Sequence, residues 1–123
     1  MDCIFCEIIN ENSPSKLLYE NEKIKVIMDI NPNSNGHLLI IPIKHYTTFE
    51  DLDDQILIEI HNTAKLMNKL LTKALNPDGI TLVNNYGINQ MVKHYHLHII
   101  PVYKDDSGLE NIDNIFQKIK DVM

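Results

Sequence analysis

The 123-residue sequence contains no arginine, so all eleven basic residues are lysine. They are outnumbered by 17 acidic residues, which gives a formal net charge of −6. A nucleic-acid-binding module neutralises phosphates with a basic face, and this charge balance argues against one. Without a guanidinium fork, any bound phosphate must be held by histidine, lysine, helix ends or backbone N–H groups.

Long apolar runs are missing as well. The longest uninterrupted one covers residues 38–43, whereas a helix needs about 20 apolar residues to span a bilayer. The first ten residues, MDCIFCEIIN, have no basic segment ahead of an apolar core, so they do not match a secretory signal peptide. With only two cysteines, we expect a cytoplasmic protein whose thiols stay reduced unless a metal binds them.

Length and hydrophobic periodicity predict a single domain. A chain of this size, with 44% hydrophobic residues, can bury one core. Thr48 and Asp51 can cap the longest helical pattern, and Asn76 and Pro77 end it. The order of elements favours an α+β fold built on an antiparallel meander. The predicted elements are a helical turn at 3–10, strands at 16–20, 23–29, 37–43, 79–84 and 94–102, and helices at 49–75 and 109–122.

Three histidines alternate with other residues in HYHLHII, residues 94–100. Alternate side chains of a strand share a face, so His94, His96 and His98 are predicted to point the same way. A histidine that caps a core accounts for one of them but hardly for three. The outer two Cα atoms would lie roughly 13 Å apart in a strand, which is too far for all three rings to bind one metal comfortably.

A division of roles fits this spacing better, with an outer histidine for structure and the central one for chemistry. Neutral imidazole is available at pH 7, and a hydrogen bond to one ring nitrogen can fix the tautomer. His96 is therefore suited to nucleophilic attack on phosphorus, while a protonated neighbour offsets phosphate charge.

HYHLHII resembles the His-x-His-x-His signature of the histidine triad (HIT) nucleotide-binding proteins. The resemblance extends over nearly the whole chain through three blocks: DCIFCEII, DINPNSNGHLLIIPIKHY and NNYGINQMVKHYHLHIIP. It implies a single HIT domain over residues 1–123, an α+β fold with an antiparallel five-stranded meander sheet, one long central helix and short terminal helices. It also implies a homodimer that binds a purine nucleotide.

The family's reaction passes through a covalent nucleotidyl-histidine on the middle histidine of the triad, which the resemblance assigns to His96. His37 and His98 match the histidines that contact the phosphate and the leaving group. Asp29 matches the acid that holds the ribose hydroxyls. The apolar slot for the base is matched by Ile4, Phe5, Ile8, Ile27 and Ile30, although the same residues taken alone would be interpreted as plain core.

The phosphate loop departs from the family pattern. Asn84 and Gln90 match polar groups that orient the phosphate, but the loop is shorter here, so either Asn84 or Asn85 faces the phosphate. The glycine that commonly precedes the glutamine is Asn89, a residue that tolerates positive φ. The position after it, often Ser or Thr, is Met91, which cannot donate a hydrogen bond.

Cys3 and Cys6 have the two-residue gap with which two thiolates bind one tetrahedral zinc. Zinc needs two further ligands. In one bacterial branch of the family these are a histidine after the central strand and the first histidine of the triad, which correspond to His45 and His94. The resemblance therefore implies a closed, structural Zn²⁺ site; the alternative is two buried thiols and two hydrogen-bonded histidines.

The resemblance thus implies a HIT-type purine nucleotide-binding hydrolase that cleaves nucleoside 5′-phosphoramidates or related P–N and P–O linkages and releases AMP. Two alternatives stay open. One is a dinucleoside polyphosphate hydrolase on the same fold. The other is a nucleotide-binding or scaffolding module with vestigial catalysis, which Met91 makes thinkable.

Overall fold

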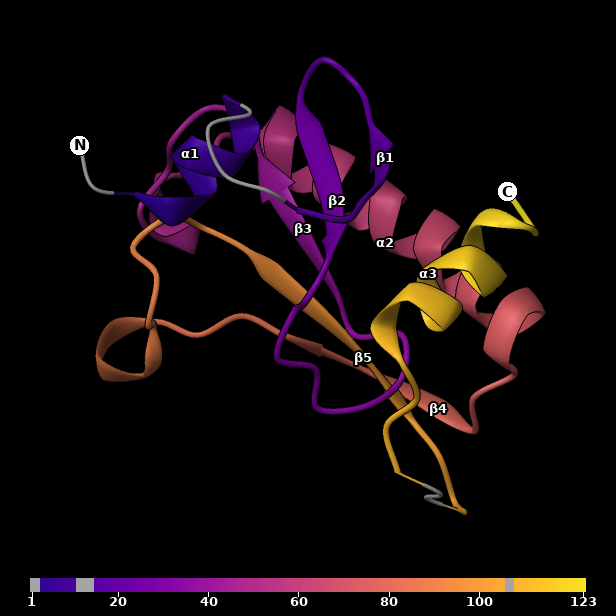
Figure 1. Cartoon of the computed structure of the whole chain (residues 1–123). Helices are drawn as coiled ribbons and strands as arrows, with labels where there is room; N and C mark the ends of the chain where they lie inside the picture. The colour runs from indigo at the N-terminus through magenta and orange to yellow at the C-terminus, as the bar shows by residue number, and fades with distance from the viewer. Residues whose placement is uncertain (1–2, 11–14, 106–107) are drawn as a thin grey trace.

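The computed structural model describes residues 3–10, 15–105 and 108–123, and its architecture is α+β, which confirms the predicted fold class. Five antiparallel strands form one sheet. Within these residues, no helix combines the length and hydrophobicity that crossing a membrane requires. The strands are β1 (Leu17–Glu20), β2 (Ile24–Met28), β3 (Leu38–Pro42), β4 (Gly79–Val83) and β5 (Leu97–Val102), and the helices are α1 (Ile4–Ile9), α2 (Asp54–Leu75) and α3 (Ile112–Lys120) (Figure 1).

The first three strands of the sheet form a meander, whereas the last two lie in the reverse of their sequence order. The order of the sheet is β1-β2-β3-β5-β4, so β5 lies in the interior and β4 at the edge. The register pairs Leu39 with His98, which brings the histidine strand directly beside the strand that follows His37. The long connection from β4 to β5 contains the 3-10 helix η2 (Gly87–Asn89) and extends toward α1 (Figure 1).

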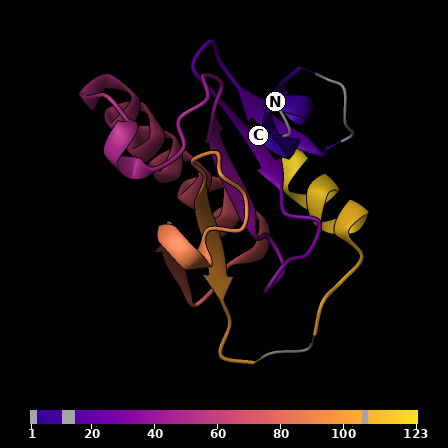
Figure 2. The same cartoon turned by 90° about the vertical axis from the view of Figure 1, so that its left-hand side faces the viewer.

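Side-chain alternation divides the core into two layers, because successive strand residues face opposite sides of the sheet. Figure 2 shows α2 on one side of the sheet and α1 on the other. The larger layer joins β2, β3 and β5 to α2 and α3 through Val26, Ile40, Ile99, Met67 and Ile119, among others. The smaller layer lies beneath α1 and consists of Cys3, Phe5, Ile27, Leu39 and Ile41.

The observed elements are shorter than the predicted ones, and in two segments the difference has a clear structural reason. The segment 49–75 is not one helix: the 3-10 helix η1 (Phe49–Asp51) comes first, and Asp53 then caps α2 by accepting from the backbone N–H of Ile56. The strand predicted at 94–102 begins only at Leu97, because the preceding residues cross toward α1 instead of pairing in the sheet.

Gly36 turns the chain into β3 and so sets the position of the next residue, His37. Its φ of +91° lies in the region that favours glycine, and an added Cβ would come within 2.7 Å of Cδ1 of Leu75 on α2. Both constraints require glycine here.

Candidate active site and metal cluster

Imidazole rings form a row on the α1 side of the sheet. The ring of Phe5 packs edge-on against both His94 and His96, with a centroid distance of 4.8 Å to His96. The rings of His96 and His98 lie 4.8 Å apart, and His98 in turn contacts His37. The three histidines therefore lie on one side, as the spacing predicts, but only His98 belongs to the paired strand.

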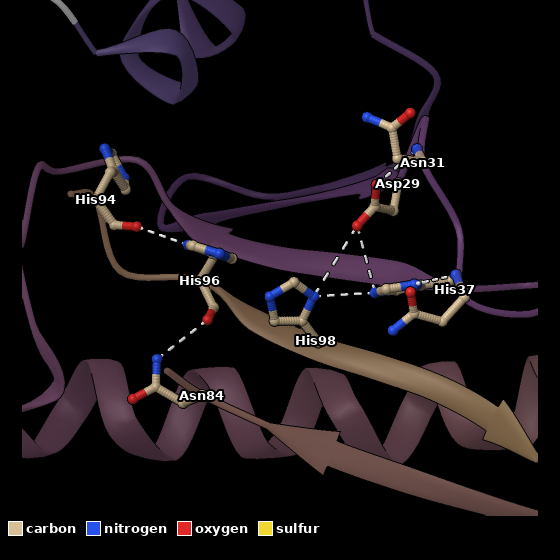
Figure 3. Close-up of polar contacts among 8 residues, drawn as sticks. Asp29, Asn31, His37, Asn84, His94, His96 and His98 are labelled. Carbon is tan, nitrogen blue, oxygen red and sulfur yellow. Dashed lines mark hydrogen bonds and ion pairs between the residues drawn. The ribbon is translucent and has the colours of Figure 1, made fainter. Parts of the chain in front are cut away.

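The tautomer of His96 is fixed by the backbone. Its Nδ1 lies 2.8 Å from the carbonyl oxygen of His94, and because a carbonyl can only accept, Nδ1 carries the proton (Figure 3). Burial lowers the pKa of His96, so the ring is neutral at pH 7. The unprotonated Nε2 is thus available as a nucleophile.

A second set of hydrogen bonds orients His37 and His98. The backbone N–H of Asn33 donates to Nδ1 of His37, which places the His37 proton on Nε2. That nitrogen lies 2.9 Å from Nδ1 of His98 and 3.4 Å from the Asp29 carboxylate. Nδ1 of His98 therefore accepts, its proton resides on Nε2, and in Figure 3 this second nitrogen points toward His96.

Burial keeps this pair uncharged in the free protein. It lowers the pKa of His98 to about 4, with further lowering by His96 and His37, and the nearby Asp29 carboxylate offsets only part of the effect. Burial likewise lowers the pKa of His37, against the opposing effect of Asp29. A bound anion would act in the same direction as Asp29 and favour protonation.

A cavity of about 470 Å³ opens over His96 and His98, within the size range of small-molecule sites. Asp29 lies at its rim, where its other oxygen accepts from the backbone N–H of Asn31. Among the described residues, no lysine lines this cavity, so the histidine side chains are the groups that can become positively charged next to a bound anion. The predicted apolar slot residues all line it: Ile4, Phe5, Ile8, Ile27 and Ile30.

His37, which contacts His98, does not line the cavity, and neither do two other residues that were predicted to contact the phosphate. Asn84 does not line the cavity; its side-chain amide donates to the carbonyl of His96 at 3.2 Å. Gln90 is 3% exposed and donates to the carbonyl of Thr47, also away from the cavity. Of the two alternatives that the sequence left open, Asn85 lines the cavity and Asn84 does not.

Other cavity residues were not predicted as part of the site. Leu39 shares the face of His37 by strand alternation and pairs with Ile27, so the period-two pattern could have identified it. Met91, noted as a departure from the family pattern, lines the cavity and is 89% exposed. Val92 and Asn89 come from the same loop, whose course no local pattern predicts.

Cys3, Cys6, His45 and His94 converge next to this cavity. Their ligand atoms all lie within 4.8 Å of one another, including 3.2 Å from Cys6 Sγ to His45 Nδ1 and 3.4 Å from Cys3 Sγ to His94 Nδ1. Ligands around tetrahedral zinc lie about 3.4–3.8 Å apart. The cluster thus joins α1, the segment after β3 and the triad.

The protonation states of this cluster suit a metal. Nε2 of His94 donates to the carbonyl of Pro42 at 2.9 Å, so the lone pair is on Nδ1, the atom that faces the thiols. Burial lowers the pKa of His94, which keeps the ring neutral. Burial and the neighbouring Cys3 raise the pKa of Cys6 to about 11, so a metal would displace a thiol proton on binding.

Asp29, His37 and His98 are also close enough to hold a metal. Here the tautomers do not fit. Asn33 already uses the Nδ1 lone pair of His37, and the proton on Nε2 points into the space that an ion would occupy. This group is suited to hydrogen bonding with an anion instead.

The tautomers predict a specific NMR pattern. At pH 7, long-range ¹H–¹⁵N spectra should show neutral rings with the proton on Nε2 in His37 and His98 and on Nδ1 in His96. His98 should stay neutral until the pH approaches about 4. Since the unfolded chain takes up this proton near pH 6.5, stability should fall as the pH drops through that window. A charged His98 at pH 7 would contradict the arrangement.

Comparison with known proteins places this geometry in a family. Residues 10–105 match the family model of the HIT domain. The chain is 38% identical to a HIT-like protein of Methanocaldococcus jannaschii, over 96% of this chain and 98% of that protein. It is 36% identical to the adenosine 5′-monophosphoramidase hnt1 of Schizosaccharomyces pombe, over 89% of this chain and 80% of that protein.

A solved structure of another histidine triad protein has the same fold. The Zn-bound histidine triad family protein from Mycobacterium smegmatis superposes with a TM-score of 0.90 at 26% identity, covering 99% of this chain and 93% of that one. The match of the family model, the relatives over most of their lengths and the triad geometry agree. The chain belongs to the HIT domain family.

Proposed function

We propose that this chain is a purine nucleotide-binding hydrolase that acts through a covalent nucleotidyl group on His96, and that it is a nucleoside 5′-phosphoramidase releasing AMP. The observation that carries the proposal is the hydrogen bond from Nδ1 of His96 to the carbonyl of His94. It leaves a neutral imidazole with a free Nε2 at the cavity wall. The activity named for the fission yeast relative supports the choice of reaction.

In the first step, Nε2 of His96 attacks the phosphorus bonded to the 5′ oxygen of the nucleoside. The N–P bond to His96 forms, the bond from phosphorus to the leaving amine breaks, and the amine keeps the electron pair. The amine needs a proton, for which Nε2–H of His98 is placed. The phosphoryl charge raises the pKa of His98 in the complex, so that the pair takes up a proton from solvent on binding.

In the second step, water hydrolyses the nucleotidyl-histidine. Neutral His98 accepts a proton from the attacking water, the new O–P bond forms, and the electron pair of the N–P bond returns to His96. AMP leaves, His98 returns its proton to solvent, and the free site is again uncharged. The side-chain amide of Asn84 donates to the carbonyl of His96 and so holds the backbone of the nucleophile in place during both steps.

The nucleoside would lie across the α1 side of the cavity. Ile4, Phe5, Ile8, Ile27 and Ile30 offer an apolar slot for the base, and the Asp29 carboxylate at the rim can accept from the two ribose hydroxyls. Asn85, one of the two asparagines that the sequence left open for this role, would contact the phosphoryl group in place of Asn84 and Gln90.

We also propose that the protein forms a homodimer through the β4 edge. β4 is an edge strand with the sequence GITLV, which carries no charge, and Leu82 in it is 46% exposed. Natural edge strands are usually protected from pairing by charge, proline or a cover. An uncharged, apolar edge fits pairing with a second copy.

The Cys3, Cys6, His45 and His94 cluster would hold one zinc ion per chain. Four protein ligands leave no open position for water, so the ion would supply structural cross-linking and no chemistry. The Zn-bound mycobacterial structure supports the choice of metal. Through this cluster the N-terminal helix is attached to the segment after β3 and to the triad.

Replacing the nucleophile tests the reaction. His96→Gly should lower the turnover of adenosine 5′-phosphoramidate by at least about 10³-fold, because no other group can form the covalent intermediate, while AMP still binds. His61→Ala, at an exposed position of α2, is the matched control and should keep full activity.

The same assay separates the alternatives. A wild-type preference for diadenosine polyphosphates over the phosphoramidate would favour the dinucleotide hydrolase. Measurable AMP binding with no turnover of either substrate would favour the binding module. A His96→Gly variant with a tenth of wild-type turnover would refute covalent catalysis.

Metal analysis tests the cluster. Protein purified without chelator should contain one zinc ion per chain, and Cys6→Ser should lose most of it. Removing zinc should lower the melting temperature before it lowers activity, since the ion binds only the folded chain. Less than about 0.2 zinc per chain in the wild type would argue for free thiols, given the tight binding expected of two thiolates and two imidazoles.

A further inference from the structure

Lys25 is a buried lysine near the start of β2. It is 8% exposed and lies on the α1 face of the sheet, between Glu20 on β1 and Ile41 on β3 in the strand register. Its ammonium group donates to the carbonyl of Ile9 at 3.2 Å and lies 3.5 Å from the carboxylate of Glu20. A charged lysine is rarely buried without such partners, which indicates that its position matters.

The contact with Ile9 satisfies a need of α1. The last carbonyls of a helix lack partners within it, and a cation there also interacts favourably with the helix dipole. α1 has no basic residue in its own last turn. Lys25 supplies the missing cation from the sheet, on the face that α1 covers.

Among the described residues, polar contacts hold α1 to the rest of the chain only at its two ends. At the N-terminal end these are the contacts of Cys3 and Cys6 with His45 and His94. At the C-terminal end the contact is that of Lys25 with Ile9.

α1 carries part of the cavity wall. Ile4 and Phe5 lie at the N-terminal end beside the two cysteines, and Phe5 also packs on His96, whereas Ile8 lies next to Ile9 at the C-terminal end. Moving the C-terminal end of α1 would therefore shift Ile8, and with it this part of the wall, relative to the sheet. The helix has only six residues, so its internal hydrogen bonds alone are too few to keep it folded, and it depends on contacts with the rest of the chain.

We infer that Lys25 is a positioning residue that fixes α1, and with it the α1 wall of the nucleotide cavity, against the sheet. The functional part of this inference rests on the proposed nucleotide binding. Lys25 touches no reacting atom, and the nucleophile is held by other contacts. Its loss should weaken nucleotide affinity and leave turnover at saturating substrate unchanged.

Lys25→Met tests this, because methionine keeps the apolar stem and removes the ammonium. AMP affinity by calorimetry should fall about five- to tenfold, in line with the loss of a charge-assisted hydrogen bond. The amide of Asn10, which donates to the carbonyl of Cys6, should exchange with solvent about tenfold faster. Zinc content and kcat should stay at wild-type values, and Lys25→Arg should restore most of the affinity.

Glu20→Gln is the matched control. It removes the ion pair but leaves the donor to Ile9, so affinity and Asn10 exchange should both stay at wild-type values. If Lys25→Met does not fold, Lys25→Leu, which also lacks a donor, is measured in the same way, with the same expectation.

Unchanged Asn10 exchange in the folded lysine variant would overturn the inference, whatever the affinity. Faster exchange with unchanged AMP affinity would also overturn it. If the wild type binds no AMP, the proposed function fails. Exchange at Asn10 then decides separately whether Lys25 fixes α1.

Discussion

The hydrogen bond between Nδ1 of His96 and the carbonyl of His94 is the contact on which the site depends. It fixes a neutral ring with its lone pair at the cavity, and it makes the position of the nucleophile depend on the backbone of His94. That backbone is itself held, because the His94 ring contacts Cys3 and Cys6 on one side and the carbonyl of Pro42 on the other. His94 thus links the cysteine and histidine cluster, the sheet and the nucleophile.

Protonation separates two clusters that look alike in composition. Both are groups of histidines with cysteine or aspartate, and both bring their ligand atoms within 4.8 Å. In the first cluster, Nε2–H of His94 donates to the carbonyl of Pro42, so the lone pair on Nδ1 faces the thiols. In the second, Nδ1 of His37 accepts from the backbone N–H of Asn33, so the proton on Nε2 faces His98. The first suits a cation and the second an anion.

Much of this could be predicted from the sequence, and the exceptions have physical reasons. Apolar runs bounded by turn residues predicted the strands, and a period of 3.6 predicted the long helix, because burial selects apolar residues at those positions. The position of β5 between β3 and β4 depends on long-range pairing, which local patterns do not encode. The places of Asn84, Asn85 and Gln90 depend on the course of one irregular loop, and the role inferred for Lys25 depends on a contact between α1 and β2.

Rapid-quench trapping of the intermediate tests the central claim most directly. Enzyme mixed with adenosine 5′-phosphoramidate, quenched in alkali and digested, should yield a peptide carrying one adenylyl group on His96, and NMR should place the bond on Nε2. Attachment through Nδ1 would contradict the tautomer that the His94 carbonyl imposes. Attachment to another residue, or turnover without any adenylylated peptide, would contradict the assignment of His96 as the nucleophile.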